Sequence, residues 1–307
     1  MRTARPGISR YRGGPGRFFY EMTEQIQKIV LPNGVRIVLE RIPHLRSASV
    51  GFWLDVGSRN ETEAESGISH FIEHMLFKGT SKHTALQLFH QMNLLGGNFN
   101  AFTSQENLCL TAKVIDEHLP AAIDLLAEML LDSVYDESEI ERERNVILEE
   151  VKMYDDTPDE HVIDIFMDHF YAGNPLGRPI LGPPENIRRF SRQDIRRFVS
   201  REFAPDRIVI AIAGSFDPAS IEAQLRRLFE PVSPNGHERN PVIAPSPAYR
   251  SHNVEKKLAQ VHFCMGTDGP ARTSDDRFAF AVMSTILGGG SSSRIFQEVR
   301  EKRGLAY

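Results

Sequence analysis

The feature that most constrains this chain is the stretch GISHFIEHMLFKGT at residues 67–80, an apolar helical run that carries His70, Glu73 and His74. A polar side chain in a buried helix costs free energy unless a partner satisfies it. With His70 at zero degrees on a helical wheel, Glu73 falls at about −60° and His74 at about +40°. The three side chains therefore share one face, and the fold must place a partner opposite them.

This arrangement is typical of a metal site. Two histidines one helical turn apart can bind a single metal ion, and the intervening glutamate points into the same space. There it can accept a proton from an attacking water molecule. His-x-x-Glu-His is the inverted form of the zinc-protease signature. The competing interpretation is a chance match in which the histidines are hydrogen-bonded core residues, but three polar side chains on one stripe favour the metal site.

A zinc hydrolase needs a third protein ligand and one open position. The best candidate segment is SEIERERNVILEEVKMYDDTP, whose acids mostly form a solvated face. Glu143 and Glu150 are seven residues apart and share a stripe with Val146 and Ile147, which indicates that the stripe faces the core. Glu149 lies about 100° away from it. We therefore expect Glu150 to bind the metal and Glu143 to orient one of the histidines.

Length and composition exclude several classes of protein. The 307 residues suit about two domains, and the apolar and charged fractions of 41% and 25% are those of a soluble globular protein. A net charge of −5 gives no support for nucleic-acid binding, and no apolar run is long enough to span a membrane. The two cysteines, Cys109 and Cys264, do not indicate a disulfide framework, so we expect a location in a reducing cytoplasm.

The first 21 residues carry five arginines and no acidic residue before Glu21. An Arg-rich, acid-poor start is typical of a transit peptide, which gives mitochondrial-type targeting as the alternative location. Two prolines and several glycines in this stretch interrupt any amphipathic helix, so a disordered extension is the interpretation that we favour.

Periodicity predicts an α+β fold with a mostly antiparallel sheet and helices packed on it. Pro-Asn-Gly between two alternating runs predicts a hairpin over residues 27–43. The other predicted strands cover 46–57, 98–115 and 207–216, and the predicted helices cover 67–79, 84–97, 116–170 with a break near 155–158, 191–203 and 217–229.

The domain organisation follows from a proline-rich interruption. We expect a disordered extension at 1–21, a zinc-binding catalytic domain at 22–230, a linker at 231–249, and an incomplete second domain at 250–307. Within the last part, KKLAQVHFCMGTDG predicts a strand and DRFAFAVMSTILGGG predicts a helix that ends in glycines.

Taken together, the chain resembles the pitrilysin-type zinc peptidases, which are the insulinase and mitochondrial processing peptidase family and are called inverzincins. The resemblance rests on His70, Glu73 and His74, on Glu143 and Glu150, and on two further blocks, LLGGNFNAFTSQENLCL and GGGSSSRIFQEVREKRGLAY. It runs from about residue 25 to residue 307 and is greatest for the shorter bacterial members, which implies that the expected cytoplasmic location is bacterial. It implies a fold of two homologous domains, of which the second is truncated here.

The resemblance also implies roles for individual residues. His70, His74 and Glu150 would bind Zn²⁺, and Glu73 would be the general base. Asn100 and Ala101 match the positions at which an edge strand binds a peptide or an unfolded protein segment as an added β-strand. Arg300 and Tyr307 match a second-domain pair that reaches toward the substrate and its oxyanion.

The expected function is therefore that of a zinc-dependent endopeptidase, with a homodimer or a partner subunit as a further possibility. The main alternative is a non-catalytic subunit of the same family that binds substrate or a partner, although such members lose motif residues that are present here. A small-molecule lyase with the same signature fits poorly, because it needs a nearby catalytic cysteine that Cys109 does not obviously supply.

Overall fold

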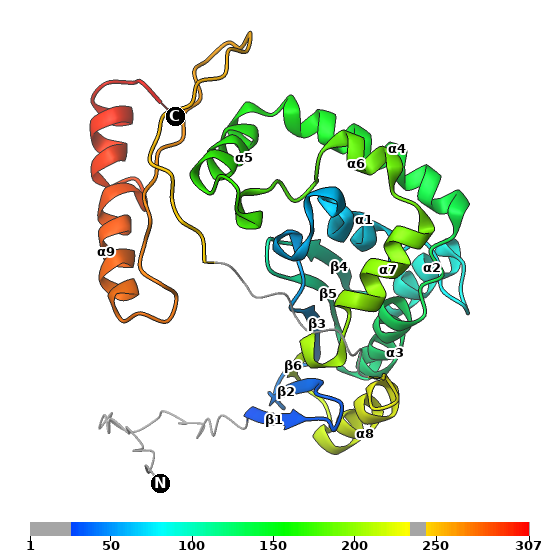
Figure 1. Ribbon diagram of the computed structural model, residues 1–307. Helices are drawn as coiled ribbons and strands as arrows, with labels where there is room; N and C mark the ends of the chain where they lie inside the picture. The colour runs from blue at the N-terminus through cyan, green and yellow to red at the C-terminus, as the bar shows by residue number, and fades with distance from the viewer. Residues whose placement is uncertain (1–25, 234–243, 307) are drawn as a thin grey trace, which may run out of the picture.

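The computed structural model describes residues 26–233 and 244–306 (Figure 1). The arginine-rich extension at 1–21, part of the predicted linker at 231–249, and Tyr307 lie wholly or partly outside the described residues, so the expectations for them stay predictions.

One six-stranded sheet forms the frame, with the strand order β1-β2-β6-β3-β5-β4. Only β2 and β6 pair in parallel, and every other neighbouring pair is antiparallel, which confirms the predicted mostly antiparallel sheet. The strands are β1 (Ile26–Val30), β2 (Arg36–Arg41), β3 (Ser47–Leu54), β4 (Asn98–Thr103), β5 (Leu108–Ile115) and β6 (Ile208–Gly214). β3 thus ends three residues before the predicted Gly57.

The predicted hairpin joins β1 to β2. The amide of Leu31 donates to the carbonyl of Val35 at 2.8 Å, and Gly34 has φ of 99°, a conformation that glycine adopts without steric cost. The side-chain amide of Asn33 donates to the carbonyl of Phe229 at 2.7 Å. The turn therefore also ties the hairpin to the end of α8 (Pro218–Phe229).

Helices cover one face of the sheet. Alternate strand residues such as Ile210 and Phe52 are fully buried and join one core with Phe71, Leu126 and Phe198 from the helices. The helices of this part are α1 (Ile68–Met75), α2 (Ala85–Leu95), α3 (Leu119–Leu131), α4 (Glu137–Asp155), α5 (Pro158–Phe170), α6 (Pro184–Arg189), α7 (Arg192–Glu202) and α8. The predicted break near residue 155 separates α4 from α5 and is confirmed, whereas α6 was not predicted.

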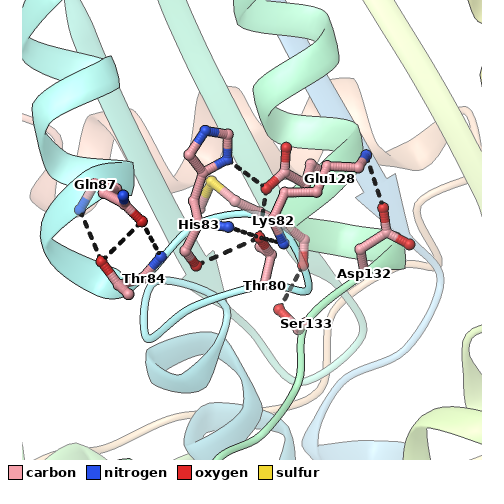
Figure 2. A network of polar contacts seen from close by, with 9 residues as sticks. Thr80, Lys82, His83, Thr84, Gln87, Glu128, Asp132 and Ser133 are labelled. Carbon is pink, nitrogen blue, oxygen red and sulfur yellow. Dashed lines mark hydrogen bonds and ion pairs between the residues drawn. The ribbon is translucent and has the colours of Figure 1, made fainter.

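A polar network fastens the loop between α1 and α2 to α3 (Figure 2). The buried carboxylate of Glu128 on α3 accepts from the hydroxyl of Thr80 and contacts Nδ1 of His83 at 2.8 Å. The Thr80 hydroxyl in turn accepts from the amides of Lys82 and His83 at 3.1 and 2.9 Å. Thr80 therefore joins the backbone of this loop to the side chain of Glu128 on α3.

The prediction for the C-terminal part is half right. The helix α9 (Asp276–Gly288) forms as expected, but residues 256–269, predicted as a strand, form no strand in the structure. A strand needs a neighbour to pair with its backbone, and this segment is instead exposed over most of its length, with Val261 at 92% exposure. Figure 1 shows α9 standing apart from the sheet, and none of its residues is buried.

Across the described part of the chain, the helices are too short or too polar to traverse a lipid bilayer.

The core predicts one strong stability effect. Phe52 is fully buried on β3 and packs edge-to-face on Phe229 at 5.3 Å between ring centroids. Replacing Phe52→Ala should lower the free energy of unfolding by about 3–5 kcal/mol, because the side chain leaves a cavity. The matched change Phe278→Ala on α9, where the side chain is 62% exposed, should cost under about 0.5 kcal/mol. Denaturant titration followed by the fluorescence of the single tryptophan, Trp53, measures both, and equal losses would contradict this description of the core.

Candidate metal centre

The helix α1 places the three motif side chains. Its residues Phe71, Ile72 and Met75 are buried against the core, which fixes the rotation of the helix about its axis. His70 is 8% exposed and shares the remaining face with Glu73 and His74. The predicted one-sided arrangement is therefore present.

The helix α4 supplies the opposite wall. It begins at a cap in which the Asp136 carboxylate accepts from the amide of Ser138 at 2.8 Å. Ile147 is fully buried and Glu143 is 6% exposed, as the stripe predicted. Val146 is an exception, because it is 50% exposed and lies at the edge of the stripe rather than in the core.

His70, His74 and Glu150 come together as the sequence predicted. One ligand atom from each lies within 4.8 Å of the others, and no other such group of three or more His, Cys, Asp or Glu side chains occurs among residues 26–233 and 244–306. The Nε2 atoms of His70 and His74 lie 3.8 and 3.5 Å from the carboxylate oxygens of Glu150. Glu149 is exposed and pairs with Lys152 at 2.7 Å, so it takes no part.

The geometry fits a zinc ion. Ligand atoms bound tetrahedrally to zinc at about 2.0–2.2 Å lie about 3.4 Å from one another. The His74–Glu150 distance of 3.5 Å is close to this value and longer than a good hydrogen bond. Two imidazoles and one carboxylate are also a donor set of catalytic zinc sites.

Glu143 lies beside His74, the histidine that we expect it to orient. Its Oε2 atom lies 3.1 Å from Nδ1 of His74, and its Oε1 atom lies 2.5 Å from Nζ of Lys78. Burial alone would raise the pKa of Glu143, but the hydrogen bonds with His74 and Lys78 outweigh it and lower the pKa below its ordinary value. A charged carboxylate at this position favours the tautomer of His74 that carries its proton on Nδ1 and turns an unprotonated Nε2 toward Glu150.

Glu73 lies beside the ligands and is held by β4. The hydroxyl of Thr103 donates to the Glu73 carboxylate at 2.6 Å. Burial raises the pKa of Glu73 above its ordinary value, and this outweighs the lowering by the Thr103 hydrogen bond and by His74. A carboxylate with a raised pKa is better suited to accept a proton near neutral pH.

Asn100 and Ala101 lie on β4, the strand at one edge of the sheet. Asn100 is exposed and pairs with Thr111, whereas Ala101 is 9% exposed and pairs with Leu110. The predicted substrate-binding pair thus occupies the strand that also carries Thr103. The far edge of this strand has no neighbour in the described sheet.

Of the predicted second-domain pair, the structure describes only Arg300. Arg300 lies in the single π-helical turn Phe296–Glu301, where its guanidinium lies over the ring of Phe296 at 4.8 Å. Tyr307 lies outside the described residues. Their roles toward the substrate stay predictions.

Two residues of the site were missed by the sequence reasoning. Thr103 follows Ala101 by two residues, so strand alternation places both on the face toward α1. Lys78 follows His74 by four residues, which is the spacing of neighbours on a helix, although α1 itself ends at Met75. Both signals were present in the sequence, but neither residue type is specific for a metal site.

Comparison with known families gives two matches. The model of the insulinase family, peptidase family M16, matches residues 36–184, and that of the peptidase M16 inactive domain matches residues 189–307. The chain is 42% identical over 293 residues to an uncharacterized zinc protease, SCO5738, of Streptomyces coelicolor, and covers 63% of its length. It is 40% identical over 284 residues to another, YmxG of Bacillus subtilis, and covers 68% of its length. In each case the match takes in 92% of this chain.

Solved structures show the same fold. A protease from Helicobacter pylori is similar with a TM-score of 0.78 at 26% identity, over 92% of this chain and 70% of that one. Pitrilysin is similar with a TM-score of 0.65 at 23% identity, over 73% of this chain and 24% of that one.

The ligand geometry predicts metal binding that depends on Glu150. The protein should bind one zinc ion per chain. Loss of a hydrogen-bond partner of a ligand weakens metal binding by about 10–100-fold, and Glu150→Gln should weaken it by more, because it removes a ligand. The neighbouring change Glu149→Gln should leave the affinity unchanged, because that side chain points to solvent. Competition titration with a chelating dye measures both, and equal affinities of the two variants would contradict the assignment of Glu150.

A second prediction concerns acid stability without metal. Burial, and to a smaller extent His74, lowers the pKa of His70 from 6.5 to about 3. Between these values the unfolded chain binds a proton that the folded chain does not, so the free energy of unfolding should fall as the pH decreases from about 6.5 toward 3. In His70→Gln this fall should be smaller.

The exposed His90 provides the control, because His90→Gln should leave the pH dependence unchanged. Denaturant titrations of the chelator-treated protein across this pH range test the point. A wild-type slope in His70→Gln would show that other groups cause the acid sensitivity.

Proposed function

Because this chain belongs to the insulinase family of peptidases, peptidase family M16, we propose that it acts as a zinc-dependent metalloendopeptidase on peptides or unfolded protein segments. The observation that carries the proposal is the convergence of His70, His74 and Glu150 with Glu73 alongside them. The relatives that share the family are named zinc proteases, which supports Zn²⁺ as the metal.

His70, His74 and Glu150 would hold the zinc ion, and Glu143 with Lys78 keeps His74 in the tautomer that this requires. When bound, the ion supplies Lewis acidity, which polarises a scissile carbonyl and makes water more acidic. The chain itself supplies the ligand geometry and the proton acceptor.

Glu73 is the general base in this proposal. Its carboxylate takes a proton from the attacking water and later passes it to the leaving amine. Thr103 holds one carboxylate oxygen at 2.6 Å, which limits the rotation of the side chain and leaves the other oxygen to face the reacting atoms. The raised pKa supports the same role, since it brings the proton affinity of Glu73 closer to that of the groups with which it exchanges protons.

We further propose that the substrate binds as an added strand along β4. The free edge of β4 offers backbone donors and acceptors, and its residue Thr103 touches the general base. A peptide paired with residues 98–103 would therefore run past Glu73, and backbone pairing is compatible with many side-chain sequences. Asn100 and Ala101 would lie at the centre of this contact.

The alternative is a non-catalytic subunit that binds substrate or a partner. The match of residues 189–307 to the inactive domain of the family leaves this alternative in place for that part of the chain. The chain spans 63% of the length of the Streptomyces protein. We therefore propose peptide cleavage for the complete protein. We also propose that residues 250–307 form part of a second domain, which assembles either within one chain or with a partner subunit.

Removal of the general base distinguishes a zinc-dependent peptidase from a non-catalytic subunit. Glu73→Gln should reduce kcat for peptide cleavage by at least about 10²–10⁴-fold, because the proton acceptor is lost while the ligands remain. Zinc content should stay at the wild-type level, and Glu149→Gln should cleave normally. Cleavage of a quenched fluorescent peptide library, with metal analysis of each sample, measures this.

Unchanged cleavage by Glu73→Gln would eliminate the proposed mechanism. Wild-type protein that binds zinc and peptide but cleaves nothing would favour the non-catalytic subunit.

A further inference from the structure

The helix that carries both histidines cannot cap its own N-terminus. α1 begins after Gly67, which has φ of 98° and no side chain that could accept from the first amides. A Cβ atom at this position would lie 2.6 Å from the carbonyl oxygen of Leu181, so serine, aspartate or asparagine is excluded. A Cβ atom at Gly182, on the other side of this contact, would lie 2.4 Å from the carbonyl oxygen of Ser66.

Glu61 supplies the missing acceptors. Its Oε2 atom accepts from the amide of Gly67 at 2.9 Å, and its Oε1 atom accepts from the amide of Ser69 at 2.8 Å. The first amides of a helix have no acceptor within the helix, and a buried amide without a partner is costly. Glu61 is 3% exposed, so both oxygens of a buried carboxyl group are used to hold the first turn of the metal-binding helix.

The backbone of Glu61 is held from the other side. The Arg178 guanidinium donates to the carbonyl of Glu61 at 2.5 Å, and the side-chain amide of Asn186 donates to the carbonyls of Glu63 and Ser66 at 2.9 and 3.1 Å. Segment 61–66 is therefore hydrogen-bonded to residues 178–186 on one side and to the start of α1 on the other.

Hydrogen bonds also join this region to α4, the helix that carries Glu150. On α4, Arg144 donates to the carbonyls of Ile187 and Phe190, which lie at the end of α6 and just beyond it. Hydrogen bonds thus connect α4 to the α6 region and the α6 region to segment 61–66. Glu61, in turn, connects that segment to α1.

The two histidines differ in how they are oriented. Nδ1 of His74 faces Glu143 at 3.1 Å, but Nδ1 of His70 is buried and has no hydrogen-bond partner among the described residues. His70 directly follows Ser69, whose amide Glu61 holds. The ring of His70 is therefore directed by its packing and by the position of the first helical turn.

We propose that Glu61 is a positioning residue of the metal centre, which fixes the start of α1 and thereby directs His70 toward the metal, in place of the carboxylate that directs His74. This inference rests on the proposed function, because it takes a metal ion to be bound by His70, His74 and Glu150. Glu61 itself touches neither the ligands nor the reacting atoms.

The test uses Glu61→Gln, which keeps the shape of the side chain but replaces one acceptor oxygen by an NH₂ group that faces an amide donor. Zinc affinity should fall by about 10–100-fold. The visible absorption spectrum of the Co²⁺-substituted protein should change, because the geometry at His70 changes.

Asp217→Ala is the matched control. Asp217 caps α8, which carries no ligand, by accepting from the amide of Ser220 at 2.9 Å. Both variants should lower the melting temperature of the metal-free protein, since each removes a helix cap. Only Glu61→Gln should alter zinc affinity and the Co²⁺ spectrum, which a purely structural role would leave unchanged.

Arg178→Gln keeps the inference testable if Glu61→Gln does not fold. It removes the bond to the Glu61 carbonyl and leaves the carboxyl group intact, so it should weaken zinc binding by a smaller factor in the same direction. Wild-type zinc affinity and a wild-type Co²⁺ spectrum in the folded variants would overturn the proposal. A wild-type protein that itself bound no zinc would instead refute the metal centre, and this inference with it.

Discussion

The contact between α1 and α4 is the constraint on which the rest of the structure depends. Each helix buries an apolar side, through residues such as Phe71 and Ile147, and so each is forced to turn polar side chains toward the other. Unpaired, those groups would make the contact unfavourable. The bonds that link His74, Glu143 and Lys78 satisfy part of this polar surface. The nitrogen atoms of His70 and His74 that face Glu150 lie 3.8 and 3.5 Å from its carboxylate, so these atoms are directed at a common point.

Much of this contact was predictable because it depends on periodicity. Helical spacing alone placed His70, Glu73 and His74 on one face and separated Glu150 from Glu149, and both results are confirmed. Helical spacing also placed Val146 on the buried stripe, but its side chain is 50% exposed, because spacing does not show where the neighbouring helix stops covering the stripe. The mostly antiparallel sheet was also predictable, from alternation and from the Pro-Asn-Gly turn.

What could not be predicted depends on contacts between distant segments. No periodic pattern links Glu61 to Gly67, since the link arises from a loop folded against residues 178–186. The segment 256–269 has the composition of a strand but no strand beside it, and strand propensity cannot supply a pairing partner. Thr103 became recognisable as part of the site only after β4 was placed against α1.

The position of β6 has a consequence for how the molecule is assembled. β6 comes last in sequence among the strands of the described residues, yet it lies between β2 and β3 and pairs with both. Without it the sheet consists of two separate pieces, the hairpin β1–β2 and the group β3-β5-β4. During synthesis, all four residues of the candidate site, His70, Glu73, His74 and Glu150, therefore leave the ribosome before β6. Pairing β6 with β2 and β3 closes a long loop, which makes it a slow, non-local step. The candidate metal centre is thus supported by a sheet whose central strand, β6, is the last to be added.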